Sequence, residues 1–287
     1  MLFLCIRTYC GSKTNRHRVE PVKKTQMYKR IIDETTPLRI GSDLAELFPK
    51  ILAVANPVLV KPCAPDCTPL RSPLKRYDKS MATQDHWQRI YQTKSPQETS
   101  WYQPHLQTSL DWISEAVPDR SASIIDVGGG EATLVDDLLA RQYRSLTVVD
   151  VAEAAIRKSQ NRLGPAAKSI HWIVGNLTEV SLPPRAYDLW HDRAVFHFFT
   201  ESEQRMAYVR QLASSLKIGG HALIATFGPQ GPEKCSGLLT RRYDAESLLR
   251  ELGQDFRLVR DAVVEHQTPF GTTQQFLYCH LRLCCRH

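Results

Sequence analysis

Residues 124–132 read Ile-Ile-Asp-Val-Gly-Gly-Gly-Glu-Ala, an apolar run that ends in three consecutive glycines. The apolar residues predict a buried strand, and the glycines predict a tight turn that leads directly into a helix. Glycine is needed at such a turn because the backbone must bend sharply and a ligand must approach it without meeting a Cβ atom. The stretch therefore predicts a strand, a ligand-binding turn and a helix.

The sequence around this unit alternates between strand patterns and helix patterns. Five strands are predicted at 123–127, 146–150, 170–174, 187–191 and 221–227, with helices between them at 133–142, 152–163 and 201–216. Near-continuous apolar strands separated by helices are typical of a parallel sheet covered on both faces. A helix at 245–252 precedes two strand patterns, 256–264 and 274–283, whose short connection predicts an antiparallel hairpin. The predicted fold class is α/β, a Rossmann-like doubly wound sheet with an antiparallel C-terminal hairpin.

The first 80 residues differ from the rest in charge and composition. They contain 15 Lys or Arg, 7 Asp or Glu and 8 of the 17 prolines, whereas residues 81–287 contain 22 basic and 23 acidic residues. Three interpretations of residues 1–80 stay open: a disordered basic tail, a mitochondrial-type presequence, or upstream sequence from a misassigned start, which we favour. We predict that residues 81–287 form the domain, with short helices at 86–91 and 106–117 leading into it.

Charge and hydropathy limit the classes of partner. The net charge of +7 belongs to the N-terminal segment, so the domain lacks the clustered positive charge that a nucleic-acid groove requires. No stretch approaches the roughly 18 apolar residues of a membrane span, and no membrane association is expected. The eight cysteines show no convincing metal-ligand pattern and predict reduced thiols. We expect a cytoplasmic protein, or a mitochondrial one if residues 1–80 are a presequence.

Asp150 predicts which ligand the glycine turn binds. It ends the second strand, 24 residues beyond Asp126, where a carboxylate accepts hydrogen bonds from both ribose hydroxyls of an adenosine. Glu131 at the start of the following helix would repel a pyrophosphate, and Thr133 stands where a dinucleotide fingerprint has its third glycine. S-adenosylmethionine has no phosphate and carries a cationic ammonium and sulfonium. Electrostatics therefore favours S-adenosylmethionine over NAD as the cofactor.

These motifs resemble the class I S-adenosylmethionine-dependent methyltransferases over nearly all of residues 84–287. The glycine-rich motif spans 126–132 with Ala132 in place of the last glycine, and Asn176 replaces an acidic residue that contacts the adenine amino group. Residues 100–103, with Ser109 and Leu110, are similar to the entry segment of lysine methyltransferases acting on citrate synthase and elongation factor 1A. The resemblance implies a cofactor site formed by Trp101, Tyr102, Asp126, Gly128, Gly129, Gly130, Glu131, Asp150, Val151, Asn176, Leu177 and His191.

The reacting end is predicted at the carboxyl ends of the later strands. Asp192 and His197 are the candidate catalytic residues, although Asp192 is also suited to capping the next helix, and His197 to the core with Phe196, Phe198 and Phe199. Arg193 and Cys235 are candidate substrate residues. Cys235 lies in a long loop, 228–238, suited to a lid, where the adjacent Lys234 would lower its pKa. His266 is predicted to lie in a solvated loop.

The sequence thus predicts a methyltransferase whose acceptor is a small molecule rather than a protein side chain, a choice that rests on the absence of an added recognition domain. A protein lysine methyltransferase is the alternative acceptor class. A non-catalytic module that binds S-adenosylmethionine, and an NAD-dependent oxidoreductase, are the rival functions. The oligomeric state is not predicted.

Overall fold

The strands β1 (Ser123–Val127), β2 (Ser145–Asp150), β3 (Ile170–Val174) and β4 (Tyr187–Arg193) form the parallel part of a sheet, as a computed structural model of the chain shows. The structure describes residues 79–284, and side chains from Gln84 onward. The predictions for residues 1–78 lie outside these described residues and stay predictions.

Within the described part of the chain, seven strands form this sheet in the order β3-β2-β1-β4-β5-β9-β8. Strand β5 (Leu216–Phe227) pairs parallel with β4 and antiparallel with β9 (Thr273–Leu283). Strand β8 (Phe256–Gln267) pairs antiparallel with β9 and closes the edge. The predicted fold class, including the antiparallel C-terminal hairpin, is confirmed.

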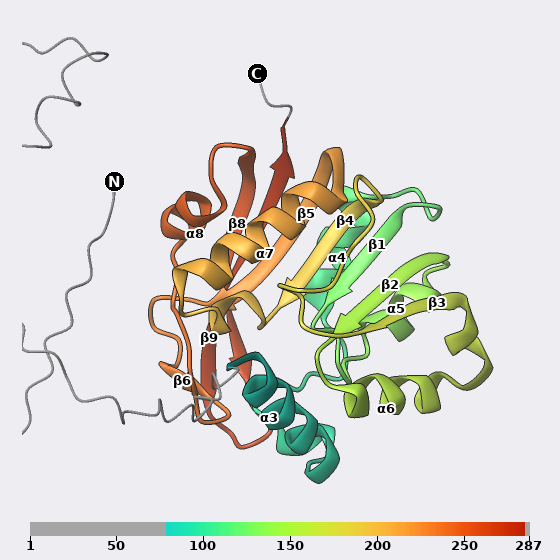
Figure 1. Cartoon of the computed structure of the whole chain (residues 1–287), viewed down its shortest axis with the longest axis vertical. Coiled ribbons are helices and arrows are strands. Elements are labelled where there is room, and N and C mark those ends of the chain that lie inside the picture. Colours follow the sequence, from blue (N-terminus) through green and yellow to red (C-terminus); the bar gives the residue numbers. More distant parts are fainter. Residues whose placement is uncertain (1–78, 285–287) are drawn as a thin grey trace, which may run out of the picture. The chain divides into compact units, whose positions relative to one another are not determined.

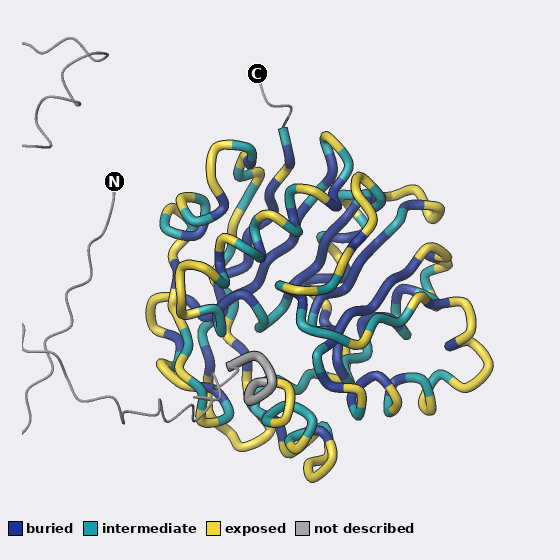
Figure 2. Tube along the Cα trace, viewed as in Figure 1, coloured by how far each residue is buried: buried dark blue, intermediate teal, exposed yellow. Residues whose placement is uncertain are grey.

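Helices cover both faces of the sheet (Figure 1). Helices α7 (Ser202–Ser215) and α8 (Ala245–Leu252) pack on one face, and α4 (Gln107–Ala116), α5 (Leu134–Ala140) and α6 (Glu153–Leu163) contribute to the other. Side chains alternate along each strand, so Ile125 belongs to the core beneath α7 and Ile124 to the core beneath α4. Figure 2 shows the central strands buried between these layers.

Several observed elements extend beyond their predicted ranges, among them β8, which continues for three residues to Gln267. Strand β4 continues for two residues to Arg193, β5 begins at Leu216, where it already pairs with Tyr187, and the helix predicted at 86–91 is α3 (Lys79–Thr93). The predicted ranges of β1, β3 and α8 coincide with the observed ones. The two extra residues of β4 matter most, because they decide which way Asp192 and Arg193 face.

Replacing Ile125 by Ala tests the two-faced core. Ile125 is completely buried, so we expect Ile125→Ala to lower the free energy of unfolding by about 2–5 kcal/mol. The exposed Val259 provides the control, and Val259→Ala should change it by less than about 0.5 kcal/mol. Urea unfolding followed by circular dichroism measures both variants, and equal effects would contradict this description of the core.

Candidate functional site

The glycine turn between β1 and α5 leaves no room for side chains. Gly128 and Gly130 adopt the positive φ angles +63° and +50°, which favour glycine. A Cβ atom on Gly128 would collide with the side chain of Val195, and one on Gly130 would lie 2.7 Å from the Tyr91 hydroxyl and 3.1 Å from Asp150 Oδ2. The turn at residues 128–130, which we call the cradle, therefore presents only backbone atoms to a ligand.

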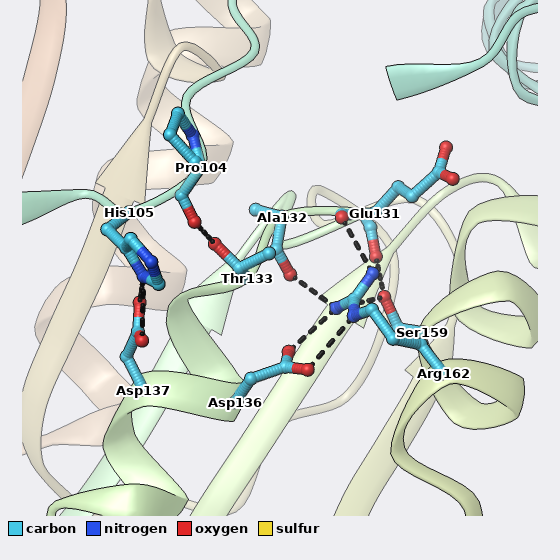
Figure 3. Close-up of polar contacts among 10 residues, drawn as sticks. Pro104, His105, Glu131, Ala132, Thr133, Asp136, Asp137, Ser159 and Arg162 are labelled. Carbon is cyan, nitrogen blue, oxygen red and sulfur yellow. Dashed lines mark hydrogen bonds and ion pairs between the residues drawn. The ribbon is translucent and has the colours of Figure 1, made fainter. Parts of the chain in front are cut away.

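Helix α6 holds this turn in place (Figure 3). Arg162 donates hydrogen bonds to the carbonyl oxygens of Glu131 (3.0 Å) and Ala132 (2.8 Å) and pairs with Asp136. The Ser159 hydroxyl donates to the Gly130 carbonyl at 2.8 Å. The carbonyls of the turn are thus occupied on the α6 side, and the turn is a rigid element of the site.

Asp150 lies buried beside the turn, at the carboxyl end of β2. Its Oδ1 accepts a hydrogen bond from the Ala152 amide at 2.8 Å. Burial raises the pKa of Asp150 to about 7; nearby Asp126 also raises it, and backbone amides including those of Ala152 and Gly130 oppose the rise. A carboxylate in this setting gains stability from any ligand that donates hydrogen bonds to it.

A second buried carboxylate, Asp126, is fixed by its neighbours. The His191 Nδ1–H donates to Asp126 Oδ1 at 2.7 Å, and His191 Nε2 lies 2.9 Å from the Ser109 hydroxyl. A Cβ atom on Gly129 would come within 2.5 Å of Asp126 Oδ2, so the middle glycine of the turn makes room for this carboxylate. Asp126 is thereby held directly under the turn.

Two adjoining cavities open at this edge of the sheet. The larger has a volume of about 960 Å³, part of it open to solvent. The smaller has a volume of about 580 Å³. The larger is lined by Asp150, Val151, Asn176 and Leu177 among others, and the smaller by Tyr102, Asp126, Gly129, Glu131 and His191. Gly128, Trp101 and Arg193 line both, and Gly130, which lines neither, lies under Tyr91 beside Asp150.

Polar contacts surround the start of α5. Asp136 and Asp137 occupy its first turn and pair with Arg162 and His105, and the Glu131 carboxylate lies 3.2 Å from Lys158 Nζ. The Thr133 hydroxyl donates to the Pro104 carbonyl at 2.7 Å (Figure 3). These contacts tie the start of α5 to α6 and to the segment before α4.

Comparison with known families agrees with this geometry. Residues 124–220 match the family model described as a methyltransferase domain. Over these residues the chain contains a methyltransferase domain. The cradle, Asp150 and the carboxylates near the smaller cavity fit S-adenosylmethionine.

Individual relatives differ in their acceptors. The chain is 22% identical over 200 residues to human EEF1A lysine methyltransferase 2, covering 63% of this chain and 77% of that protein. It is 34% identical over 108 residues to malonyl-[acyl-carrier protein] O-methyltransferase of Anoxybacillus flavithermus, covering 37% of this chain and 39% of the relative. The mouse eEF1A lysine and N-terminal methyltransferase is 17% identical over 156 residues, 52% of this chain, which spans about a fifth (22%) of that relative's length.

Solved structures of the same fold also resemble the domain. The 1,6-didemethyltoxoflavin-N1-methyltransferase of Burkholderia thailandensis, solved with S-adenosylhomocysteine, has a TM-score of 0.58 at 17% identity, covering 80% of this chain and 94% of that one. The [4+2]-cyclase SpnF has a TM-score of 0.52 at 15% identity, covering 67% and 86%. These likenesses concern the fold and leave the acceptor open.

Asp192 of the methyltransferase domain does not line either cavity. It is completely buried, accepts hydrogen bonds from the Val195 amide (3.0 Å) and the Tyr208 hydroxyl (2.7 Å), and caps the short helix that follows β4. Burial raises the pKa of Asp192 to about 6. The structure therefore places the first catalytic candidate in a capping role, the alternative that the sequence left open.

His197 also lies away from the cavities. Its ring is completely buried and stacks on Phe227, whose amide donates to His197 Nδ1 at 3.2 Å. Burial and the charge of Arg193 lower the pKa of His197 to about 3. A catalytic role for His197 at the described cavities is therefore not supported. Phe196 joins it in the core, but Phe198 and Phe199, predicted as core, line the larger cavity.

Cys235 lines the larger cavity, but the prediction that Lys234 lowers its pKa is wrong. The loop 228–238 forms part of a small hairpin, β6 (Lys234–Cys235) with β7 (Leu238–Leu239), in which Lys234 is exposed and Cys235 is buried. Burial raises the pKa of the Cys235 thiol, and this effect outweighs neighbouring positive charge. Cys235 is thus a neutral thiol in the cavity wall.

Asn176 uses its side chain locally. Its Oδ1 accepts from the Thr178 amide (3.1 Å) and hydroxyl (2.9 Å), and its Nδ2 donates to Glu179 at 2.8 Å. Asn176 still lines the larger cavity, but these bonds shape the loop after β3. The side-chain contact with adenine that the family resemblance implied would compete with them.

Sequence reasoning missed the contribution of α3. Trp87 and Tyr91 line the larger cavity, and Trp87 packs edge-on against Trp101 at 5.7 Å between ring centroids. Their spacing of four residues places both on one helix face, which was the available signal. What the sequence did not indicate is that this face covers the glycine turn.

Two glycine variants test the cradle. Gly128→Ala should weaken S-adenosylhomocysteine binding by at least about tenfold, because the new methyl group displaces Val195. Gly164 also has a positive φ, +56°, but has nothing within 4 Å of its Cβ position, so Gly164→Ala carries only the backbone strain of about 1–2 kcal/mol. Calorimetric titration of the full chain measures both, and equal affinities would contradict the proposed cradle.

The pKa of Asp150 predicts how cofactor binding depends on pH. Ribose hydroxyls donate to the ionised carboxylate, so binding favours deprotonation. Because the pKa of Asp150 is raised to about 7, affinity for S-adenosylhomocysteine should be low near pH 6 and rise to a plateau above about pH 8. Titrations in that range test this, with Asp150→Asn expected to bind weakly and without this pH dependence. A flat wild-type profile would contradict the assignment.

Proposed function

We propose that the chain transfers a methyl group from S-adenosylmethionine to a small, mainly apolar or aromatic molecule. The observation that carries this proposal is the aromatic lining of the larger cavity. From Asp150 it runs to a wall of aromatic rings, Trp87, Trp101 and Phe198, contributed by three separate segments. Such a space suits a compact planar acceptor.

The cofactor's adenosine would lie at Asp150 and its methionine part in the smaller cavity, where Asp126 and Glu131 favour an ammonium group. When bound, the cofactor supplies an electrophilic methyl group on a cationic sulfur. The chain's own task is to align the acceptor with that methyl group and exclude water. The aromatic rings and the glycine turn, which has no side chains, line the cavity in which the acceptor would be aligned.

Arg193 favours a neutral or anionic acceptor. Its guanidinium donates to the Trp101 carbonyl (2.9 Å) and the Tyr278 hydroxyl (3.1 Å) and lies 4.7 Å from the centre of the Phe276 ring. It lines both cavities, so a lysine ammonium entering them would meet a fixed positive charge. This electrostatic argument supports a small acceptor over a lysine side chain.

The alternative is a protein lysine acceptor. It is supported by the similarity to human EEF1A lysine methyltransferase 2, which extends over 200 residues, and by the entry segment at residues 100–103. In that case the lysine would have to enter as the neutral amine, because of Arg193. The two acceptor classes predict opposite results in one assay.

The assay compares acceptors directly. The full chain is incubated with S-adenosylmethionine and either a set of small phenols, thiols and nitrogen heterocycles or purified elongation factor 1A, and S-adenosylhomocysteine formation is followed. We expect turnover with members of the small-molecule set and none above background with the protein. Turnover with elongation factor 1A alone would favour the alternative, and cofactor binding without turnover in either arm would favour a non-catalytic module.

A further inference from the structure

A third cavity lies next to Arg193. It has a volume of about 340 Å³ and is lined by Gln103, His105, Arg193, His266, Phe276 and Tyr278 among others. Arg193 also lines the two cofactor-site cavities, and Gln103 lines the smaller one. The third cavity thus shares a wall with the place where the methionine part of the cofactor would lie.

His266 occupies this cavity in a defined tautomer. It lies near the end of β8 and is 1% exposed, contrary to its predicted position in a solvated loop. Its Nε2 lies 2.7 Å from the Ser100 carbonyl oxygen, which only accepts, so Nε2 carries the hydrogen and Nδ1 carries the lone pair. Nδ1 is buried, and no group in the described part of the chain donates to it. Burial and the charge of Arg193 lower the pKa of His266, and the hydrogen bond to Ser100 opposes this effect without cancelling it.

We propose that a phenol or enol acceptor places its ring in the larger cavity and its hydroxyl group in this one, that His266 Nδ1 takes the proton of that hydroxyl group, and that Arg193, which lines both cavities, stabilises the resulting oxygen anion. This inference rests on the proposed methyl transfer and names the chemistry of its acceptor. Asp192 and His197 line none of these cavities, whereas His266 lines the third one and has a buried ring nitrogen to which no described group donates.

The wall of the cavity selects this acceptor class. A buried lone pair needs a donor, and an O–H group is a stronger donor than a thiol. Arg193 disfavours an ammonium, and the rings of Phe276 and Tyr278 suit a planar molecule. A phenol or enol hydroxyl meets all three conditions.

The step conserves atoms and charge. The acceptor oxygen forms a bond to the methyl carbon, the carbon–sulfur bond breaks with its electron pair remaining on sulfur, and the hydroxyl proton passes to His266 Nδ1. The products are the methyl ether, S-adenosylhomocysteine and a protonated imidazole that returns its proton to water. Proton transfer to a weakly basic histidine becomes favourable as the new bond forms, because the oxygen loses electron density.

The other groups that line this cavity do not compete for the role. His105 is exposed and its Nδ1 lies 3.0 Å from the Asp137 carboxylate, and the Tyr278 hydroxyl accepts from Arg193. Arg193 is the permanent charge facing His266. His105→Asn is therefore a matched control, since it removes from the same cavity wall an exposed imidazole whose Nδ1 is paired with Asp137.

The test uses the full chain labelled with ¹⁵N, saturated with S-adenosylhomocysteine and titrated with phenol. Histidine ring nitrogens are observed by NMR, and His266→Asn assigns the signal. We expect the Nε2–H tautomer of His266 and a saturable shift of its Nδ1 signal with phenol. Anisole, which has no O–H group, should leave that signal unchanged. Phenol affinity should fall about tenfold in His266→Asn and less than about twofold in His105→Asn.

The outcomes separate this inference from the proposed function. The Nδ1–H tautomer, equal shifts with phenol and anisole, or no saturable shift would overturn the role of His266 while leaving cofactor binding intact. Absence of S-adenosylhomocysteine binding would overturn the proposed function, and phenol titration of the unliganded chain would then still test the cavity. In an assay of anisole formation, His266→Asn should lower kcat with unchanged S-adenosylhomocysteine affinity. Equal kcat in His266→Asn and wild type would also overturn the role.

Discussion

The close approach of the glycine turn to the buried carboxylate of Asp150 is the constraint on which the site depends. A single Cβ atom on Gly130 would touch both Asp150 and the Tyr91 hydroxyl. The turn, the end of β2 and helix α3 are therefore packed too closely for any side chain at this position. Burial leaves the ionised form of the Asp150 carboxyl poorly solvated, and its pKa is therefore raised to about 7. The apolar sheet and the hydrogen bonds from Arg162 hold the turn next to this carboxylate. A ligand with two hydroxyl donors would offset the carboxylate's lost solvation.

The register of the parallel strands carries this constraint across the sheet. Asp126 pairs in register with His191 on β4, and this pairing places the histidine where it can hold the carboxylate beneath Gly129. Strand β4 continues for two more residues, which alternate in direction: Asp192 points into the core toward Tyr208, and Arg193 points to the cavities. One strand end therefore supplies a structural carboxylate and a functional cation at successive positions.

This alternation explains how far the sequence could predict the site. The glycine turn, Asp150 and the sheet follow from local patterns of apolar residues, glycines and spacing, which is why they could be predicted. The direction of the Asp192 side chain depends on where β4 ends. The predicted end of β4 was two residues too early, so this direction could not be predicted. Lys234 and Cys235 lie side by side in a short strand and face opposite ways, so their adjacency in sequence does not bring charge to the thiol. His266 and Tyr91 reach the site through contacts with segments more than 30 residues away, for which one sequence carries no local signal.

The distribution of charge around the cavities links the fold to the choice of acceptor. Carboxylates gather around the glycine turn, at Asp126, Glu131 and Asp150, where they suit a cationic cofactor. Arg193 lines both cavities as well and is fixed by a carbonyl, a tyrosine hydroxyl and an aromatic ring, so its charge cannot swing out to solvent without breaking these contacts. A molecule in either cavity therefore meets this positive charge. An acceptor that develops negative charge on oxygen would be stabilised by Arg193 during the reaction itself, whereas one that develops positive charge would be opposed by it.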